Sequence, residues 1–271
     1  MNKKNIICRI VRKICKILHI KPKNNDPVKE RNRAAHIEGR RLKLKKNNYV
    51  FHCDELKPTF YLPLYETDYI QQRILTEKCY YESSNLNYIC HDWSNGQIGN
   101  SIAGNCVLDI GANIGNHTLF FFFECGINKA YCFEPVSSTF NILSKNISLN
   151  GLSDKVVLLN TAVGADEGSA RIAHFDEANI GSTQIALEKV GTIPVISIDS
   201  LNIEDCIKLI KIDVEGFEVE VIRGCIKTIE QYKPYIMVEI QEENFETVES
   251  LLLPFGYQYV HIGFLNYLFY I

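Results

Sequence analysis

The sequence predicts an α/β protein whose core is a doubly wound, mostly parallel sheet. From Cys106 onward, short β-branched runs alternate with helical segments, which is the pattern of parallel strands joined by crossover helices. A turn that contains Gly111 and Gly115 follows the first of these strands. Because sheets of this kind bind ligands at the carboxyl edge of their strands, the turn also marks the expected binding site.

Hydrophobic periodicity places the individual elements. We predict core strands near 106–110, 130–133, 156–162, 208–213 and 235–240. We predict helices near 116–124, 137–149, 217–231 and 242–254. Two further strands, 170–175 and 192–198, are expected to flank a polar loop. The runs 257–262 and 267–271 predict a closing antiparallel hairpin.

Charge divides the chain into a basic arm and an acidic body. Residues 1–46 hold 16 Lys and Arg side chains against three acids, whereas the remainder holds 13 basic and 29 acidic side chains. We expect residues 1–48 to form a basic amphipathic helix and a linker. Residues 49–104 would form a small α+β extension that covers one side of the core, and residues 105–271 the ligand-binding domain.

The arm has two interpretations that stay open. Apolar residues at helical spacing over 3–20 predict an amphipathic helix. Residues 1–22 would then lie on an anionic membrane surface, or pack against the body or a second protomer. Residues 23–48 read as a linker or an exposed helix. No run approaches the roughly 20 apolar residues that a bilayer span needs.

Cysteine usage and the N-terminus indicate the compartment. The ten cysteines are scattered through apolar runs without a CxxC pair or a zinc-like spacing, which is typical of reduced thiols. Basic residues interrupt any signal-peptide core near the N-terminus. We therefore expect a cytoplasmic protein, either free or peripheral on the inner face of the membrane.

The segment after the first core strand carries the first part of the candidate site. Asp109 lies at the end of the strand, and Gly111, Asn113 and Gly115 follow in the turn. Asn113 replaces the middle glycine of a dinucleotide-binding motif, and an acid beside pyrophosphate would be unfavourable. We expect Asp109 to face a cationic amino-acid group, Gly111 to permit close approach of a ligand, and Gly115 to let the helix pack tightly on the strand.

A second acid, Glu134, ends the next strand and precedes Pro135. It lies 23 residues beyond Gly111, where a carboxylate is placed to accept hydrogen bonds from both hydroxyls of a ribose. Either feature alone is also typical of a structural turn. Together, at this spacing, they favour a ligand that contains adenosine.

Four motifs in this order resemble those of the FkbM-type methyltransferases. They are Asp109–Thr118, Phe133-Glu-Pro, Asn160-Thr-Ala-Val-Gly and Lys211-Ile-Asp-Val-Glu-Gly-Phe-Glu. The resemblance covers about residues 80–240 and leaves out the arm. It implies the seven-stranded class I methyltransferase fold, which is Rossmann-like, with S-adenosyl-L-methionine as the donor. It also implies O-methylation, often of sugars or polyketide-type products.

The resemblance assigns roles within the donor site. Asp109 and the turn after it would hold the methionine part, Glu134 the ribose, and Asn160–Ala162 the adenine. Tyr81 and Glu82, in the extension, could close over the donor. The donor-binding residues that we predict are Glu82, Asp109, Gly111, Ala112, Asn113, Gly115, Asn116, Glu134, Pro135, Asn160, Ala162 and Asp213.

The fourth core strand ends in the acids expected to act in the chemical step. A hydroxyl acceptor needs a general base, and alternation along the strand end would point Asp213 and Glu215 toward the same centre. We predict Asp213 as base or acceptor-positioning residue and Glu215 as second choice. Glu239 would either contact the acceptor or cap neighbouring backbone amides. Glu218 and Glu220 are better explained by the dipole of the helix that follows. Such acids could hold a divalent cation, but their spacing does not require one, and we predict no metal.

The leading hypothesis is an O-methyltransferase that acts on a hydroxyl of a sugar, a glycan precursor or a secondary metabolite. A nucleic-acid methyltransferase is an alternative, because the basic arm could follow phosphates. The acidic body and the lack of an Asn-Pro-Pro-Tyr-type tetrapeptide argue against a nucleic-acid partner. An NAD-linked oxidoreductase is disfavoured by the altered glycine pattern, and a non-catalytic binding module by the intact acids. The acceptor pocket is expected in 176–189 and parts of 49–100, whose residues identify neither the acceptor nor the oligomeric state.

Overall fold

The computed structural model describes residues 27–271, which divide into two compact units with a boundary between Lys46 and Asn47. The first unit contains helix α2 (Pro27–Lys46), so this part of the predicted linker or exposed helix is helical. The helix predicted over 3–20 and the membrane contact predicted for 1–22 lie outside the described residues. Within residues 27–271, no helix has both the length and the apolar character needed to cross a membrane.

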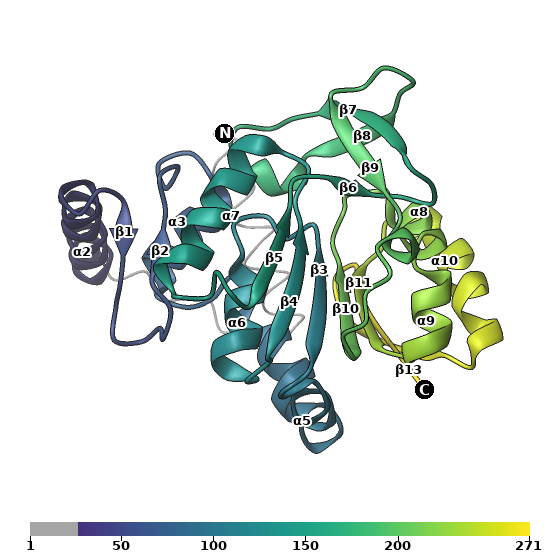
Figure 1. Ribbon diagram of the computed structural model, residues 1–271. Helices are drawn as coiled ribbons and strands as arrows, with labels where there is room; N and C mark the ends of the chain where they lie inside the picture. Colours follow the sequence, from purple (N-terminus) through teal and green to yellow (C-terminus); the bar gives the residue numbers. More distant parts are fainter. Residues whose placement is uncertain (1–26) are drawn as a thin grey trace, which may run out of the picture. The chain divides into compact units, whose positions relative to one another are not determined.

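A seven-stranded sheet forms the centre of the second unit, in the order β12-β13-β11-β10-β3-β4-β5 (Figure 1). Only β13 runs antiparallel to its neighbours, which confirms the predicted mostly parallel sheet with an antiparallel C-terminal hairpin. The strands are β3 (Cys106–Ile110), β4 (Lys129–Phe133), β5 (Val156–Leu159), β10 (Ile207–Ile212), β11 (Tyr235–Glu239), β12 (Gln258–Gly263) and β13 (Asn266–Tyr270).

Helices cover both faces of this sheet, as a doubly wound fold requires (Figure 1). One face is covered by α6 (Asn116–Glu124) and α7 (Ser137–Leu149), and the other by α8 (Glu218–Arg223), α9 (Ile226–Tyr232) and α10 (Phe245–Leu252). Buried side chains of these last three helices form one apolar core with β3, β10 and β11. Burial of this apolar surface is the main force that holds the strand ends in register.

A separate four-stranded sheet, in the order β6-β9-β7-β8, corrects two predictions. Its strands are β6 (Ala162–Val163), β7 (Gly168–His174), β8 (Gln184–Leu187) and β9 (Ile193–Ile196). β7 and β9 are the two extra strands expected, but the polar loop between them contains a further strand, β8. The third core strand, predicted over 156–162, ends at Leu159. The chain leaves the main sheet at Asn160, whose amide donates to the carbonyls of Glu134 and Pro135.

The helix predicted over 217–231 is two helices, because the chain breaks at Gly224. A side chain at this position would place its Cβ 2.0 Å from the carbonyl oxygen of Gly164. The backbone of Gly224 also accepts a hydrogen bond from the amide of Asp199. The amide of Thr228, which would bond to the Gly224 carbonyl in a continuous helix, donates instead to Oδ1 of Asp199, so Asp199 interrupts the helix.

The extension packs short elements onto the same unit. They are β1 (Val50–Phe51), β2 (Phe60–Tyr61), α3 (Tyr69–Glu77), α4 (Ser83–Asn87) and α5 (Gln97–Ile102). Asp68 caps α3, since its Oδ1 accepts from the amide of Gln71 at 2.9 Å. Its Oδ2 accepts from the amide of Ile180 at 3.3 Å, so the extension is tied to the loop that precedes β8.

Candidate active site

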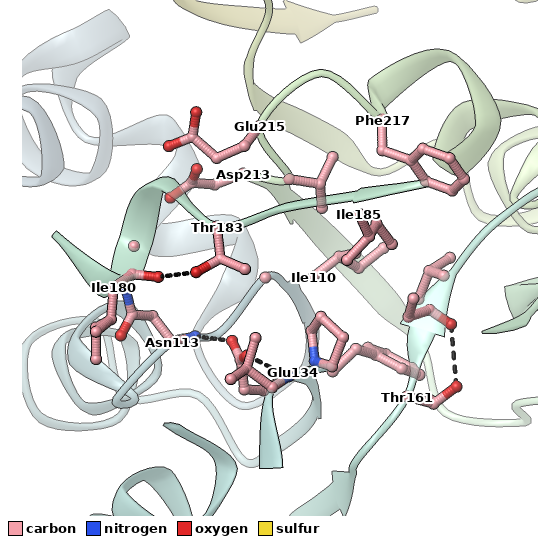
Figure 2. A pocket seen from close by; sticks show the side chains of 18 residues that line it. Ile110, Asn113, Glu134, Thr161, Ile180, Thr183, Ile185, Asp213, Glu215 and Phe217 are labelled. Atoms are coloured by element: carbon pink, nitrogen blue, oxygen red, sulfur yellow. Dashed lines mark hydrogen bonds between the residues drawn. The ribbon is translucent and has the colours of Figure 1, made fainter. Parts of the chain in front are cut away.

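A pocket lies at the carboxyl edge of the main sheet, where β10, β3 and β4 end side by side (Figure 2). Residues from all three strand ends line it, together with residues of β6 and β8 from the smaller sheet. Seven of the predicted site residues are in its wall: Gly111, Asn113, Glu134, Pro135, Ala162, Asp213 and Glu215. The expected juxtaposition of these strand ends is therefore present.

Gly111 brings the turn after β3 against the loop after β10. Its φ is +75°, and a Cβ at this position would lie 1.8 Å from the carbonyl oxygen of Asp213. The amide of Asp213 in turn donates to the carbonyl of Ile110 at 3.0 Å. Only glycine fits such a close approach in the left-handed region. Glycine is therefore required at position 111 by the backbone of Asp213, whereas we had expected it to be required by the close approach of a ligand.

Glu134 fastens the same turn to the end of β4. Its two carboxylate oxygens accept hydrogen bonds from the amides of Asn113 at 3.0 Å and Val136 at 2.8 Å. Burial raises the pKa of Glu134 to about 7, although these two amides oppose the shift. The Oδ1 atom of Asn113 is buried and has no hydrogen-bond partner within residues 27–271. A buried acceptor without a partner is a place where a bound ligand can supply the missing donor.

The wall of the pocket has an apolar part and a polar part (Figure 2). The apolar part is formed by Ile110, Phe133, Val163, Ile185 and Phe217. The polar part is formed by Asn113, Thr183, Asp213 and Glu215. Such a wall suits an elongated ligand with a flat apolar group at one end and charged groups at the other.

Asp213 and Glu215 extend to the same side of the loop after β10 (Figure 2). Strand alternation is not the cause, because β10 ends at Ile212 and Glu215 has a φ of +52°. The turn at Glu215 and Gly216 instead folds the chain so that the two carboxylates lie close together. Burial and the charge of Asp213 raise the pKa of Glu215 to about 7.

Glu239 and Glu82 bring two further acids to this edge. Glu239 ends β11, the neighbour of β10, and burial followed by repulsion from Asp213 and Glu82 raises its pKa to about 8. Glu82 comes from the extension, and its Oε2 lies 3.4 Å from Nε2 of His117. Burial opposes ionisation of Glu82, but His117 and Lys211 bring its pKa below the ordinary value. Neither acid lines the pocket itself, but Glu239 lies close enough to Asp213 and Glu82 for their charges to act on it.

Asp109 is placed differently from the prediction. Its side chain is 0 % exposed and is not part of the pocket wall, whereas the prediction placed it against a cationic group of a ligand. The cation that it faces belongs to the protein: Nζ of Lys211 lies 3.2 Å from Oδ1 of Asp109. Its other oxygen accepts a hydrogen bond from Thr118 at 2.5 Å. The acid at the end of β3 is therefore an internal partner of Lys211.

Four other predicted residues support the turn from behind. Ala112 is buried, and Gly115 packs against α7, where a Cβ would lie 2.8 Å from Leu143. Asn116 exchanges two hydrogen bonds with the backbone of Tyr81, which holds the Glu82 segment on α6. Asn160 clamps the Glu134-Pro135 turn as described above. Gly115 thus lets the start of α6 pack closely on α7, whereas we had expected it to let the helix pack on the preceding strand.

Sequence reasoning missed two features of the site. The first is Lys211, which lies in one of the four motifs but to which the sequence analysis assigns no function. A lysine inside the apolar run Ile207–Ile212 is itself a signal that a buried acid accompanies it. The second is the segment Ile180–Ile185, which was expected to build an acceptor pocket. Four of its residues line the same pocket as Glu134, and nothing in their types indicates this.

Among residues 27–271, no three His, Cys, Asp or Glu side chains are arranged to hold a metal ion. The acids at the carboxyl edge are instead balanced by Lys211, whose ammonium contacts both Asp109 and Asp213. The chemistry that this arrangement offers is proton transfer and the binding of positive charge.

Comparison with known proteins agrees with the motifs. The family model described as the methyltransferase FkbM domain matches residues 109–259. The chain is 22 % identical over 223 residues to methyltransferase sdnD of Sordaria araneosa. This alignment covers 69 % of this chain and 74 % of that protein. It is 28 % identical over 139 residues to the hexuronic acid methyltransferase AglP of Haloferax volcanii, covering 49 % of this chain and 54 % of that protein.

A solved structure, methyltransferase FkbM from Methylobacillus flagellatus KT, aligns with a TM-score of 0.48 and 16 % identity. The alignment covers 74 % of this chain and 52 % of that one, so the chain spans about half of its length. The family match itself spans more than half of this chain and contains the turn after β3, Glu134 and the acids after β10. The chain belongs to the FkbM methyltransferase family and has its class I, Rossmann-like fold.

Proposed function

We propose that the protein transfers a methyl group from S-adenosyl-L-methionine to a hydroxyl of a sugar, a glycan precursor or a secondary metabolite. The observation that carries this proposal is the single pocket that joins an apolar wall, the Glu134 carboxylate and the Asp213–Glu215 pair. These groups match the three parts of the donor: adenine, ribose and a cationic methionine end. The relative named as a hexuronic acid methyltransferase supports a sugar-type acceptor.

The donor would lie along the pocket with its adenine against the apolar wall. Glu134 would accept hydrogen bonds from the ribose through lone pairs that its two backbone partners leave free. The buried Oδ1 of Asn113 would accept from an amino group of the donor. When bound, the donor supplies a methyl group that is already activated on a sulfonium sulfur.

The protein's own contribution to the chemical step is position and proton removal. Asp213, in the pocket wall, is the residue we assign as base. It would take the hydroxyl proton as the acceptor oxygen bonds to the methyl carbon and the bond from that carbon to the donor sulfur breaks, which releases S-adenosylhomocysteine. Glu215, whose pKa is raised to about 7, is the second choice for this role. Glu239 would contact the acceptor from the neighbouring strand end. The concentrated negative charge also favours a cationic donor over a neutral analogue.

Calorimetry with S-adenosylhomocysteine and with NAD tests the donor. We expect micromolar binding of S-adenosylhomocysteine and none of NAD, and the reverse result would overturn the proposal. Transfer of a labelled methyl group to a panel of methyl glycosides, with RNA and DNA oligonucleotides beside them, tests the acceptor class. Label that enters only the oligonucleotides would favour the nucleic-acid alternative.

Asp213→Asn tests the chemical role. We expect it to weaken S-adenosylhomocysteine binding by less than about tenfold, because Glu215 still supplies a carboxylate at the methionine end. We expect it to lower kcat by about 10²–10⁴-fold, the usual contribution of a general base. Glu243 is an exposed acid in the segment after β11, so Glu243→Gln is the matched control and should leave both quantities unchanged. Normal turnover of Asp213→Asn would remove this residue from the mechanism.

A further inference from the structure

Lys211 is a buried cation at the centre of the site, and its ammonium group makes one hydrogen bond and two ion pairs. Nζ donates to the carbonyl oxygen of Gly111 at 2.7 Å and lies 3.2 Å from Asp109 and 3.5 Å from Asp213. The side chain is 3 % exposed. One ammonium group therefore contacts the end of β3, the donor turn and the carboxylate that we assign as base.

The two acids around Lys211 differ in access to the pocket. The Asp109 side chain is 0 % exposed, whereas that of Asp213 is 30 % exposed and lines the pocket. Burial alone would lower the pKa of Lys211, but Asp109 and then Asp213 raise it above its usual range, so the lysine is charged. The charged groups that face it at longer range are Glu82, Glu134 and Glu239.

We propose that Asp109 and Lys211 form a positioning pair that aligns the Asp213 carboxylate with the donor turn, and that neither residue binds the donor. This inference rests on the proposed function, because Asp213 needs alignment only if it acts on an acceptor. Asp109 balances the charge of Lys211 inside the sheet. Lys211 then holds Oδ2 of Asp213 and leaves Oδ1 for the acceptor hydroxyl.

The arrangement follows the general logic in which a reactive group is oriented by a second group and that one by a third. The Gly111 carbonyl adds a fixed reference point, since the same ammonium also holds the turn against which the donor would lie. Displacement of a reacting group by about 1 Å can cost about 10²-fold in rate. Loss of the pair should therefore reduce kcat far more than it reduces donor affinity.

The double variant Asp109→Asn/Lys211→Met tests this inference, because it removes the two fully buried charges together. Only Asp213, whose side chain is 30 % exposed, then loses its ion-pair partner. We expect S-adenosylhomocysteine to bind within about threefold of the wild type by calorimetry. We expect kcat with the best methyl glycoside of the panel to fall by about 10²-fold. The matched control is Lys129→Met/Asp205→Asn, a Lys–Asp pair at the opposite edge of the same sheet, which should change neither quantity.

Two results would overturn the inference. A folded double variant that loses more than about tenfold in S-adenosylhomocysteine affinity would show that the pair acts on the donor. A double variant with wild-type kcat would show that it positions nothing. The calorimetric measurement of S-adenosylhomocysteine binding needs no acceptor, so it tests the donor site even when no acceptor is methylated. A wild type that neither binds S-adenosylhomocysteine nor transfers methyl overturns the proposed function instead.

Thr118→Val provides a second test of the positioning role if the double variant does not fold. Thr118 donates to Asp109 and is buried, and valine has nearly its shape, so this change loosens Asp109 without removing a charge. We expect kcat to fall by about three- to tenfold with unchanged affinity for S-adenosylhomocysteine, the size of effect that the net loss of one hydrogen bond has. Unchanged kcat in this variant would overturn the positioning role.

Discussion

The two edges of the main sheet carry the same kind of ion pair in opposite surroundings. At the amino edge, Lys129 lies 2.7 Å from Asp205, and their side chains are 34 % and 32 % exposed. At the carboxyl edge, Lys211 lies 3.2 Å from Asp109, and their side chains are 3 % and 0 % exposed. The Lys129–Asp205 pair has the shorter distance, but water reaches and screens it. Access to water, more than distance, therefore separates a surface pair from one that organises a site.

The two edges differ in the same way at their glycines. Gly104 precedes β3 and Gly111 follows it, and both have left-handed φ values, +71° and +75°. A Cβ on Gly104 would meet nothing within 4 Å, whereas one on Gly111 would meet the Asp213 backbone. The carboxyl edge is thus crowded and buried, and the amino edge is open. Four predictions test this contrast.

Lys211→Met should have the largest effect on stability. It leaves Asp109 buried without its cation, and breaking a buried pair in this way costs about 3–5 kcal/mol of unfolding free energy. Urea unfolding measures this loss. Lys129→Met, at the amino edge, should cost about 0–1 kcal/mol. Equal losses in the two variants would show that burial does not distinguish the two pairs.

Gly111→Ala should come next. Strain of alanine in the left-handed region adds to overpacking against the carbonyl of Asp213, for about 2–4 kcal/mol together. Gly104→Ala has the same backbone conformation without the clash, so it should cost about 1 kcal/mol. The difference between the two unfolding free energies isolates the close approach. A difference near zero would mean that the loop after β10 moves aside freely.

The acids of the carboxyl edge should make the ligand-free protein less stable as pH rises from about 5 to 8. Burial, with repulsion between neighbouring acids, raises the pKa of Glu215 to about 7 and that of Glu239 to about 8. In this window the folded state holds more protons than the unfolded state, so the unfolding free energy decreases with pH. Glu239→Gln should flatten the slope, and the exposed control Glu243→Gln should not. An unchanged slope in Glu239→Gln would contradict this assignment.

The smallest effect is expected from salt at the amino edge. The hydrogen bond from Lys129 lowers the pKa of Asp205, and salt weakens this contact because both groups are partly exposed to water. The difference in unfolding free energy between the wild type and Lys129→Met/Asp205→Asn should shrink toward zero as salt rises from 0.05 to 0.5 M. Over this range the Debye length falls from about 14 to about 4 Å. A persistent difference above about 1 kcal/mol would place this pair in the same class as the buried one.

Much of this protein follows from its sequence alone. Alternating β-branched and helical runs predicted the parallel sheet, and Gly111, Glu134 and Asp213 marked the edge at which the pocket lies. These features are local, because a strand, a turn and an acid at a strand end are each written in a few consecutive residues. Parallel strands then bring their ends together whatever the loops between them contain.

The tertiary structure decided what the acids do. Asp109 turned out to be paired with Lys211, and Glu215 reaches Asp213 through a left-handed turn and not through strand alternation. The segment Ile180–Ile185 closes the pocket because Asp68, more than a hundred residues earlier, binds the Ile180 amide. These are contacts between residues far apart in the chain, and whether a charge meets water, a lysine or a ligand depends on packing that no local pattern records.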